Sequence, residues 1–209
     1  MRKLLFVSML LTAPALFAQD WQNLLPDASF TGWTRITIPP GSDVTPGEHW
    51  KVDTATNTVI CSGDQKHEWL RYDRVLANFE LHVEWRFTPV STGKMHYNSG
   101  VFVRNNDDGS FWHQAQAGGD NGGFWFGDTT VDGATKRINL RAEVTENRIK
   151  PPGEWNTYDI RADGPKLTLS TNGKVTSVWD DPSMLKGYIG LESEGYRIEF
   201  RNLKLKILK

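Results

Sequence analysis

The chain has 209 residues, of which 24 are lysine or arginine and 25 are aspartate or glutamate, and its formal net charge is −1. This length suits one domain. The basic residues are dispersed and form no run, so the composition argues against nucleic acid or an anionic membrane as a partner. The lone cysteine, Cys61, excludes an internal disulfide and a cysteine-based metal cluster.

The first 18 residues have the pattern of a secretory signal peptide. Met1-Arg2-Lys3 precedes an apolar run at residues 4–11, and small residues follow at 13–18. We expect cleavage after Ala18, which leaves residues 19–209 as one exported domain, periplasmic or extracellular. An apolar-leaning segment of about 14 residues is too short to span a bilayer, so no membrane insertion is expected after cleavage.

Short alternating segments separated by Gly, Pro, Asn and Asp predict an all-β fold, an antiparallel β-sandwich. The clearest strand covers residues 79–87, with large apolar side chains on one face and polar ones on the other. Asn172-Gly173 predicts a hairpin, and a change of parity near Arg201-Asn202 predicts a bulge. Other strands are predicted at residues 99–104, 111–116, 155–162, 166–171, 174–179, 187–193 and 196–208.

Outward-facing polar side chains on these strands suggest a groove for sugar hydroxyls, if the strands lie in one curved sheet. Carboxylates and amides can accept and donate hydrogen bonds to hydroxyls, and arginine supplies fixed donors. The alternative is the ordinary solvated face of an antiparallel sheet. The predicted groove contains Glu80, His82, Glu84, Arg86, Asn98, Arg104, Gln114, Gln116, Glu192 and Glu194, with Trp112 beside them.

Three residues of this region suit catalysis. Glu84 and Glu192 are a candidate carboxylate pair, and His113 is a candidate base near neutral pH. A histidine buried in the core is the competing interpretation of His113. Carboxylate and histidine together could also hold a divalent cation such as Ca²⁺ or Mn²⁺, although the sequence defines no ligand set. Asp107-Asp108-Gly109 is interpreted as a plain turn.

Taken in order, the segments resemble the 3-keto-disaccharide hydrolase domain family. The resemblance covers essentially the whole chain after the signal peptide, and its most specific motif is Asn98-Ser-Gly-Val-Phe-Val-Arg104. The other matching segments are residues 21–33, 69–70, 78–81, 84–86, 150–158, 161–164, 187–195 and 198–203. The resemblance implies a concanavalin A-like lectin/glucanase jelly roll.

The resemblance also implies an activity, cleavage of glycosides whose sugar carries a ketone at C3. The ketone acidifies the hydrogen on C2, so a base can remove it and the C1 oxygen can leave. Water then adds back, which gives net hydrolysis. Such a site needs a base, a proton donor, and donors or a metal ion to stabilise the enolate. From this we expect Asn98, Arg104, Gln114, Gln116, Trp112, Trp125 and Glu194 to bind substrate, with Glu84, Glu192 and His113 catalytic.

Three positions depart from the family pattern. Relatives usually show Tyr-Glu-x-Gln where this chain has His113-Gln114-Ala115-Gln116, and Glu192 stands where Gln is common. An amide cannot act as a base. Glu192 or Glu84 could carry the charge instead, or the protein could bind sugar without cleaving it. A third hypothesis, a structural sandwich with a merely solvated polar face, is also open.

Overall fold

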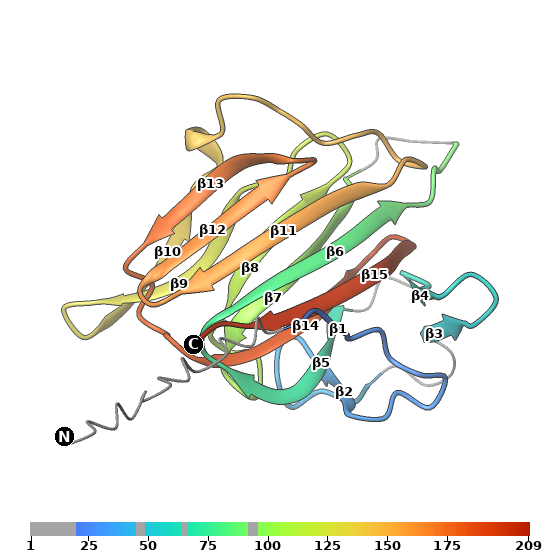
Figure 1. Cartoon of the computed structure of the whole chain (residues 1–209), viewed down its shortest axis with the longest axis horizontal. Coiled ribbons are helices and arrows are strands. Elements are labelled where there is room, and N and C mark those ends of the chain that lie inside the picture. Colours follow the sequence, from blue (N-terminus) through green and yellow to red (C-terminus); the bar gives the residue numbers. More distant parts are fainter. Residues whose placement is uncertain (1–19, 45–48, 64–66, 92–95) are drawn as a thin grey trace, which may run out of the picture.

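The computed structural model describes residues 20–44, 49–63, 67–91 and 96–209, and this part of the chain forms two antiparallel sheets packed face to face (Figure 1). The predicted β-sandwich is confirmed. The predicted signal peptide lies outside the described residues. In the described part, no helix is long and apolar enough to cross a membrane.

The order of strands within each sheet differs from their order in the chain. The first sheet is, in spatial order, β13 (Lys174–Asp180), β12 (Lys166–Thr171), β11 (Asn156–Asp163), β6 (Phe79–Phe87), β15 (Ile198–Ile207), β4 (Thr58–Cys61) and β3 (Trp50–Asp53), with β1 (Gln22–Asn23) also paired to β15. The second sheet is β10 (Ala134–Asn139), β9 (Trp125–Val131), β8 (His113–Gly118), β7 (Asn98–Asn105), β14 (Gly187–Glu194), β5 (His67–Leu76) and β2 (Trp33–Thr37). A short 3₁₀ turn, Arg141–Glu143, follows β10.

The core lies between the sheets and is rich in aromatic side chains. On β6, alternate residues are buried, as the sequence pattern predicts. Trp85 of β6 makes edge-on contacts with Phe87 and with Tyr158 of β11. Full burial of a large apolar side chain stabilises a fold by about 1.5–3 kcal/mol, so these buried aromatic residues contribute substantially to the stability of the core.

Two local predictions are confirmed. Thr171 pairs with Lys174 across the Asn172-Gly173 turn, which joins β12 to β13 as a hairpin. On β15, the register against β6 shifts between Arg201 and Lys204. This bulge reverses which face the later residues of β15 occupy, and Asn202 within it has a positive φ of 51°.

The expectation that the predicted site strands share one curved sheet is wrong. β6 belongs to the first sheet, whereas β7, β8 and β14 belong to the second. The polar side chains of β6, including Glu84, therefore lie on the outer face of the first sheet. Glu192 lies on the outer face of the second sheet, with the whole core between them, so the two glutamates cannot form a catalytic pair.

Two further predicted site residues lie in the interior. The His113 side chain is fully buried, and its ring is 4.8 Å from that of Trp179, which belongs to the opposite sheet. Trp125 is also fully buried and is part of the core cluster. His113 cannot act as a base on a surface-bound sugar, and Trp125 cannot serve as a sugar platform, because neither is accessible.

The burial of His113 predicts a pH-dependent stability. Burial, together with the nearby Arg104 charge, lowers the pKa of His113 to about 4. In the unfolded chain the pKa is about 6.5, so between these values the unfolded state binds the proton and the folded state does not. The free energy of unfolding should therefore fall as the pH falls, by up to about 1.4 kcal/mol per pH unit.

Replacing the ring with an apolar side chain should remove this dependence. We expect His113→Leu to flatten the decline between pH 6.5 and pH 4 relative to the native chain, measured by urea unfolding at several pH values. Neither ring nitrogen has a hydrogen-bond partner among the described residues, so the substitution should cost little at pH 7. The exposed His96 supplies the control His96→Gln. An unchanged slope in His113→Leu would contradict this explanation.

Candidate functional site

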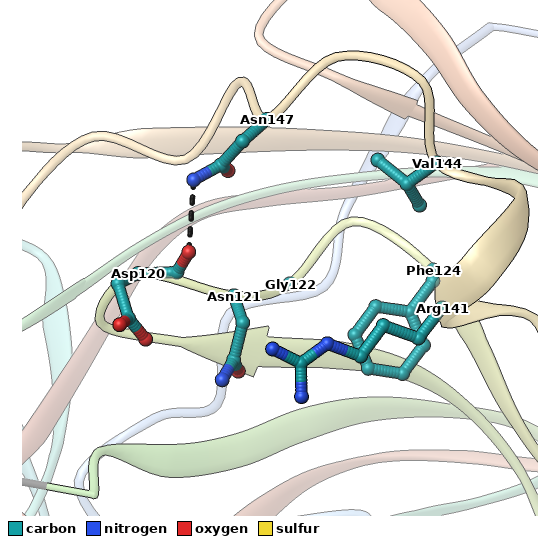
Figure 2. A pocket seen from close by; sticks show the side chains of 7 residues that line it. All are labelled: Asp120, Asn121, Gly122, Phe124, Arg141, Val144 and Asn147. Atoms are coloured by element: carbon teal, nitrogen blue, oxygen red, sulfur yellow. Dashed lines mark hydrogen bonds between the residues drawn. The ribbon is translucent and has the colours of Figure 1, made fainter.

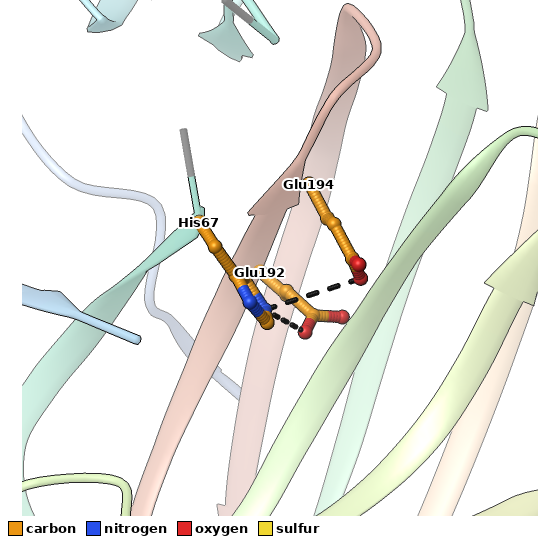
Figure 3. A group of neighbouring side chains, drawn as sticks. All are labelled: His67, Glu192 and Glu194. Atoms are coloured by element: carbon orange, nitrogen blue, oxygen red, sulfur yellow. Dashed lines mark hydrogen bonds and ion pairs between the residues drawn. The ribbon is translucent and has the colours of Figure 1, made fainter. Parts of the chain in front are cut away.

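The outer face of the second sheet carries a closed ring of six polar side chains, called here the polar ring. Three of its members are shown in Figure 3. Cross-strand pairing aligns His67, Glu194 and Asn98 on the adjacent strands β5, β14 and β7. The polar ring consists of His67, Glu192, Gln114, Gln116, Asn98 and Glu194.

Hydrogen bonds connect the ring almost continuously. His67 Nε2 lies 2.8 Å from Glu192 Oε1, and Gln114 Nε2 donates to Glu192 Oε2 at 2.5 Å. A longer contact of 3.4 Å joins Gln114 to Gln116 Oε1. Gln116 donates to Asn98 and Asn98 donates to Glu194 Oε2, each at 2.5 Å. Glu194 Oε2 is 3.9 Å from His67 Nε2, which closes the ring.

The charges of the ring are concentrated at one end. The Glu192 side chain is only 3% exposed, whereas His67 is 34% and Glu194 is 39% exposed. Burial raises the pKa of Glu192 above its usual value, although the bond to His67 and its charge partly offset this. For His67, burial alone would lower the pKa, but the Glu192 hydrogen bond and the two carboxylate charges outweigh it and the pKa is raised.

This end of the ring fits a divalent cation. One donor atom from each of His67, Glu192 and Glu194 lies within 4.8 Å of the others. Glu192 is a buried carboxylate without a lysine or arginine partner in the described part of the chain. By contrast, the buried Glu68 is paired with Arg35. One imidazole and two carboxylates are ligands that a metal such as Mn²⁺ accepts, and its charge would balance the buried carboxylate.

The ring lies flat on the sheet because two neighbouring positions are glycine. A Cβ at Gly100 of β7 would overlap the Gln114 side chain, and a Cβ at Gly190 of β14 would overlap the Trp69 ring. Trp69 packs edge-on against Phe102 at 5.5 Å and is fully buried. These contacts form an apolar support on the same face as Glu192.

Trp112 lies toward the other edge of the same sheet. The Arg137 guanidinium is 4.1 Å from the centre of its ring, and Arg137 Nε donates to Asp128 at 2.6 Å. The arginine therefore covers one face of Trp112, and no hydrogen bond joins this group to the polar ring among the described residues.

Arg104 does not reach the polar ring. Its guanidinium donates to the carbonyl oxygens of Ala77 and Gly164 and to Asn78 Oδ1. Ala77 and Asn78 connect β5 to β6, and Gly164 connects β11 to β12. Arg104 thus ties the second sheet to the connection between the two sheets and to a turn of the first sheet, and the expectation that it binds substrate is not supported by its position.

Glu84 belongs to a separate network on the outer face of the first sheet. It accepts hydrogen bonds from Arg201 at 2.7 Å and from Asn202 at 2.9 Å. Burial alone would raise the pKa of Glu84, but the bonds from Asn202 and Arg201 outweigh it and the pKa is lowered. Arg201 and Asn202 therefore keep the Glu84 carboxylate ionised, and their hydrogen bonds already engage both of its oxygen atoms.

His67 is the member of the ring that the sequence prediction missed. It begins β5, in which His67, Trp69 and Arg71 alternate with Glu68, Leu70 and Tyr72. This alternation is the signal that could have identified the strand. The structure brings together the predicted residues Asn98, Gln114, Gln116, Glu192 and Glu194 and adds His67 to them.

Comparison with solved structures identifies the fold. A Parabacteroides distasonis protein provisionally described as a glycosyl hydrolase superposes with a TM-score of 0.62 and 16% identity, covering 90% of this chain and 94% of that one. Carbohydrate-binding module CBM66 from Bacillus subtilis gives a TM-score of 0.62 and 14% identity, covering 84% and 95%. A Bacillus licheniformis β-glucanase gives 0.50 and 10%, covering 93% and 100%. The fold is a concanavalin A-like lectin/glucanase jelly roll.

Sequence comparison gives the family. No curated protein matches the chain. Residues 20–206 match the family described as the 3-keto-alpha-glucoside-1,2-lyase-like domain, which is nearly all of the chain after the predicted signal peptide. The resemblance inferred from the ordered motifs is therefore confirmed, and the chain belongs to the family of 3-keto-alpha-glucoside-1,2-lyase-like domains.

Proposed function

We propose that this protein is an exported enzyme that cleaves glycosides carrying a ketone at C3, by elimination followed by hydration, at the polar ring. The family match supports this substrate class. The observation that carries the proposal is the buried Glu192 carboxylate, hydrogen bonded to the partly exposed His67, with Glu194 beside them. Acidic, basic and amide groups thus meet on one accessible face.

In this proposal the carboxylates and amides have different roles. Bound by His67, Glu192 and Glu194, a divalent cation would polarise the C3 ketone and favour the enolate. Asn98, Gln114 and Gln116 already form hydrogen bonds with one another. Sugar hydroxyls can exchange with these bonds, because each amide offers both a donor and an acceptor. The amide row therefore orients the sugar.

Glu194 is the group best placed to move the proton. It is the most exposed of the three charged residues, and its Oε1 accepts no hydrogen bond from a described residue, whereas Oε2 accepts one from Asn98. Oε1 takes the C2 proton, the C1–O bond breaks, and the proton passes to the leaving oxygen. In the second half, water adds to C1, its proton passes through Glu194, and C2 is protonated again.

The proposal predicts that the two glutamates first considered as a pair behave differently. Glu192→Gln should lower turnover of a 3-keto-glycoside by at least about 100-fold, because it removes the buried charge from the site. Glu84→Gln is the matched control on the opposite sheet and should retain native turnover. Product release is measured by chromatography, and circular dichroism verifies folding. Full activity in Glu192→Gln would contradict the assignment.

Metal removal provides a second prediction. Dialysis against a chelator should abolish turnover, and Mn²⁺ should restore it. A ligand at about 100 times its dissociation constant stabilises the folded state by about 2.7 kcal/mol, which corresponds to a rise in melting temperature of roughly 5–10 °C. This rise should occur in the native chain and be lost in Glu192→Gln. Unchanged turnover and melting temperature after chelation would argue against a metal site.

Binding without cleavage is the second candidate function. It is favoured by Gln114, an amide where the family resemblance leads us to expect a carboxylate, and by the fold shared with carbohydrate-binding module CBM66. A binding module would bind 3-keto-disaccharides in a calorimetric titration without releasing product, and this binding would persist in Glu192→Gln. Release of product by the native chain would exclude this alternative.

A further inference from the structure

A pocket adjoins the polar ring at the end of β8 (Figure 2). Its walls come from the loop between β8 and β9 and from the segment that follows β10. Asp120 and Asn121 line it on the first side, and Arg141 and Asn147 line it on the second. Asn147 Nδ2 donates to the Asp120 carbonyl at 2.8 Å, which joins the two walls.

Strand register places this pocket directly beside the amides of the ring. Asn98 of β7 pairs with Gly118 of β8. Asn121 Oδ1 lies 2.5 Å from the position that a Cβ on Gly118 would take, so its side chain covers that glycine. The backbone N–H of Gln116 donates to the Phe124 carbonyl at 3.0 Å, which places the pocket residue Phe124 beside Gln116 on the next strand. The pocket therefore begins where the amide row ends.

The spacing between strands matches the length of a two-ring ligand. Adjacent strands lie about 4.8 Å apart, and β7 separates β14 from β8. The backbones of β14 and β8 are thus roughly 10 Å apart, which is the scale of two linked sugar rings, and the side chains of the polar ring meet in the space between them. A sugar held at Glu192 and Glu194 would direct its neighbour toward Asn121 and Arg141.

The polar groups of this pocket are free to bind a ligand. The Arg141 guanidinium and the Asp120 carboxylate form no hydrogen bond or ion pair with another described residue. Figure 2 shows the Arg141 side chain extending past the Phe124 ring toward Asn121. Phe124 itself is 6% exposed and gives the pocket an apolar wall. One cation, one anion and two amides suit a neutral, hydroxyl-rich ring better than an anionic one.

We propose that the pocket between Asp120, Asn121, Phe124 and Arg141 binds the leaving half of the substrate, a neutral second sugar ring. This inference rests on the proposed function, because it takes the polar ring as the place where the oxidised sugar binds. It assigns a role in substrate choice to the loop between β8 and β9, which the chemistry at His67, Glu192 and Glu194 does not itself use.

The test compares substrates with and without the second ring. The probes are a 3-keto-disaccharide of two glucose units and the methyl 3-keto-glucoside, whose leaving group is only methanol. We expect Arg141→Ala to raise KM for the disaccharide roughly 10-fold, through loss of charged hydrogen bonds, and to leave the methyl glycoside unchanged. Arg74→Ala, at an exposed arginine of β5, is the matched control and should alter neither substrate.

Each outcome separates this inference from the proposed function. Equal losses on both substrates, or no loss on the disaccharide, would overturn the second-ring pocket while leaving the chemistry at the polar ring intact. If the native chain cleaves neither substrate, the proposed function fails. Calorimetry of the two probes then tests whether the pocket binds the second ring. Tighter binding of the disaccharide that is lost in Arg141→Ala supports it. Equal binding of both probes, or tighter binding of a disaccharide whose second ring is a uronate, overturns it.

Discussion

The absence of side chains at Gly100 and Gly190 is the constraint on which the polar surface depends. Because strand side chains alternate between faces, both positions point outward on the second sheet, where any Cβ would overlap Gln114 or Trp69. The long amide can therefore lie across β7 and reach Glu192 on β14, two strands away. Without this flat contact the polar ring would be divided into separate surface groups, each solvated by itself.

The second determinant is the distribution of charge. Other buried carboxylates of the second sheet have arginine partners: Glu68 is paired with Arg35, and Asp128 with Arg137. Glu192 has instead a histidine and an amide. Burying a carboxylate without a full countercharge is costly, and the cost persists in a fold only when something else compensates for it. On the opposite sheet, Glu84 already has Arg201 and Asn202, so its charge is satisfied within the protein.

Local patterns predicted the strands β6–β8 and β11–β15, but they missed β1–β5, β9 and β10 and could not assign any strand to a sheet. The alternation on β6 and the Asn172-Gly173 hairpin depend on neighbours in sequence, and both were predicted correctly. Alternation tells which residues face outward, but a sandwich has two outer faces, so Glu84 and Glu192 had the same signature. For His113 the sequence left two interpretations open, a base and a buried core histidine, and the structure shows the buried one. His67 was missed because β5 had not been identified as a strand. The pocket around Arg141 is formed by two loops that come together in space, and the periodicity of a sequence does not predict such a contact.

The hydrogen bond between Gln114 and Glu192 has a consequence for how this sequence could have diverged. The family resemblance suggests a carboxylate at the first position and an amide at the second, which is the reverse of this chain. Since the two side chains touch, the reversal moves a negative charge across a single hydrogen bond and preserves the donor–acceptor pair. A lineage changing one position at a time must pass through either two carboxylates in contact or two amides with no charge. The first intermediate retains an anionic site at the cost of repulsion, which the proposed cation would relieve, and the second loses the charge altogether. If the charge is needed for function, as proposed above, the second carboxylate has to be gained before the first is lost.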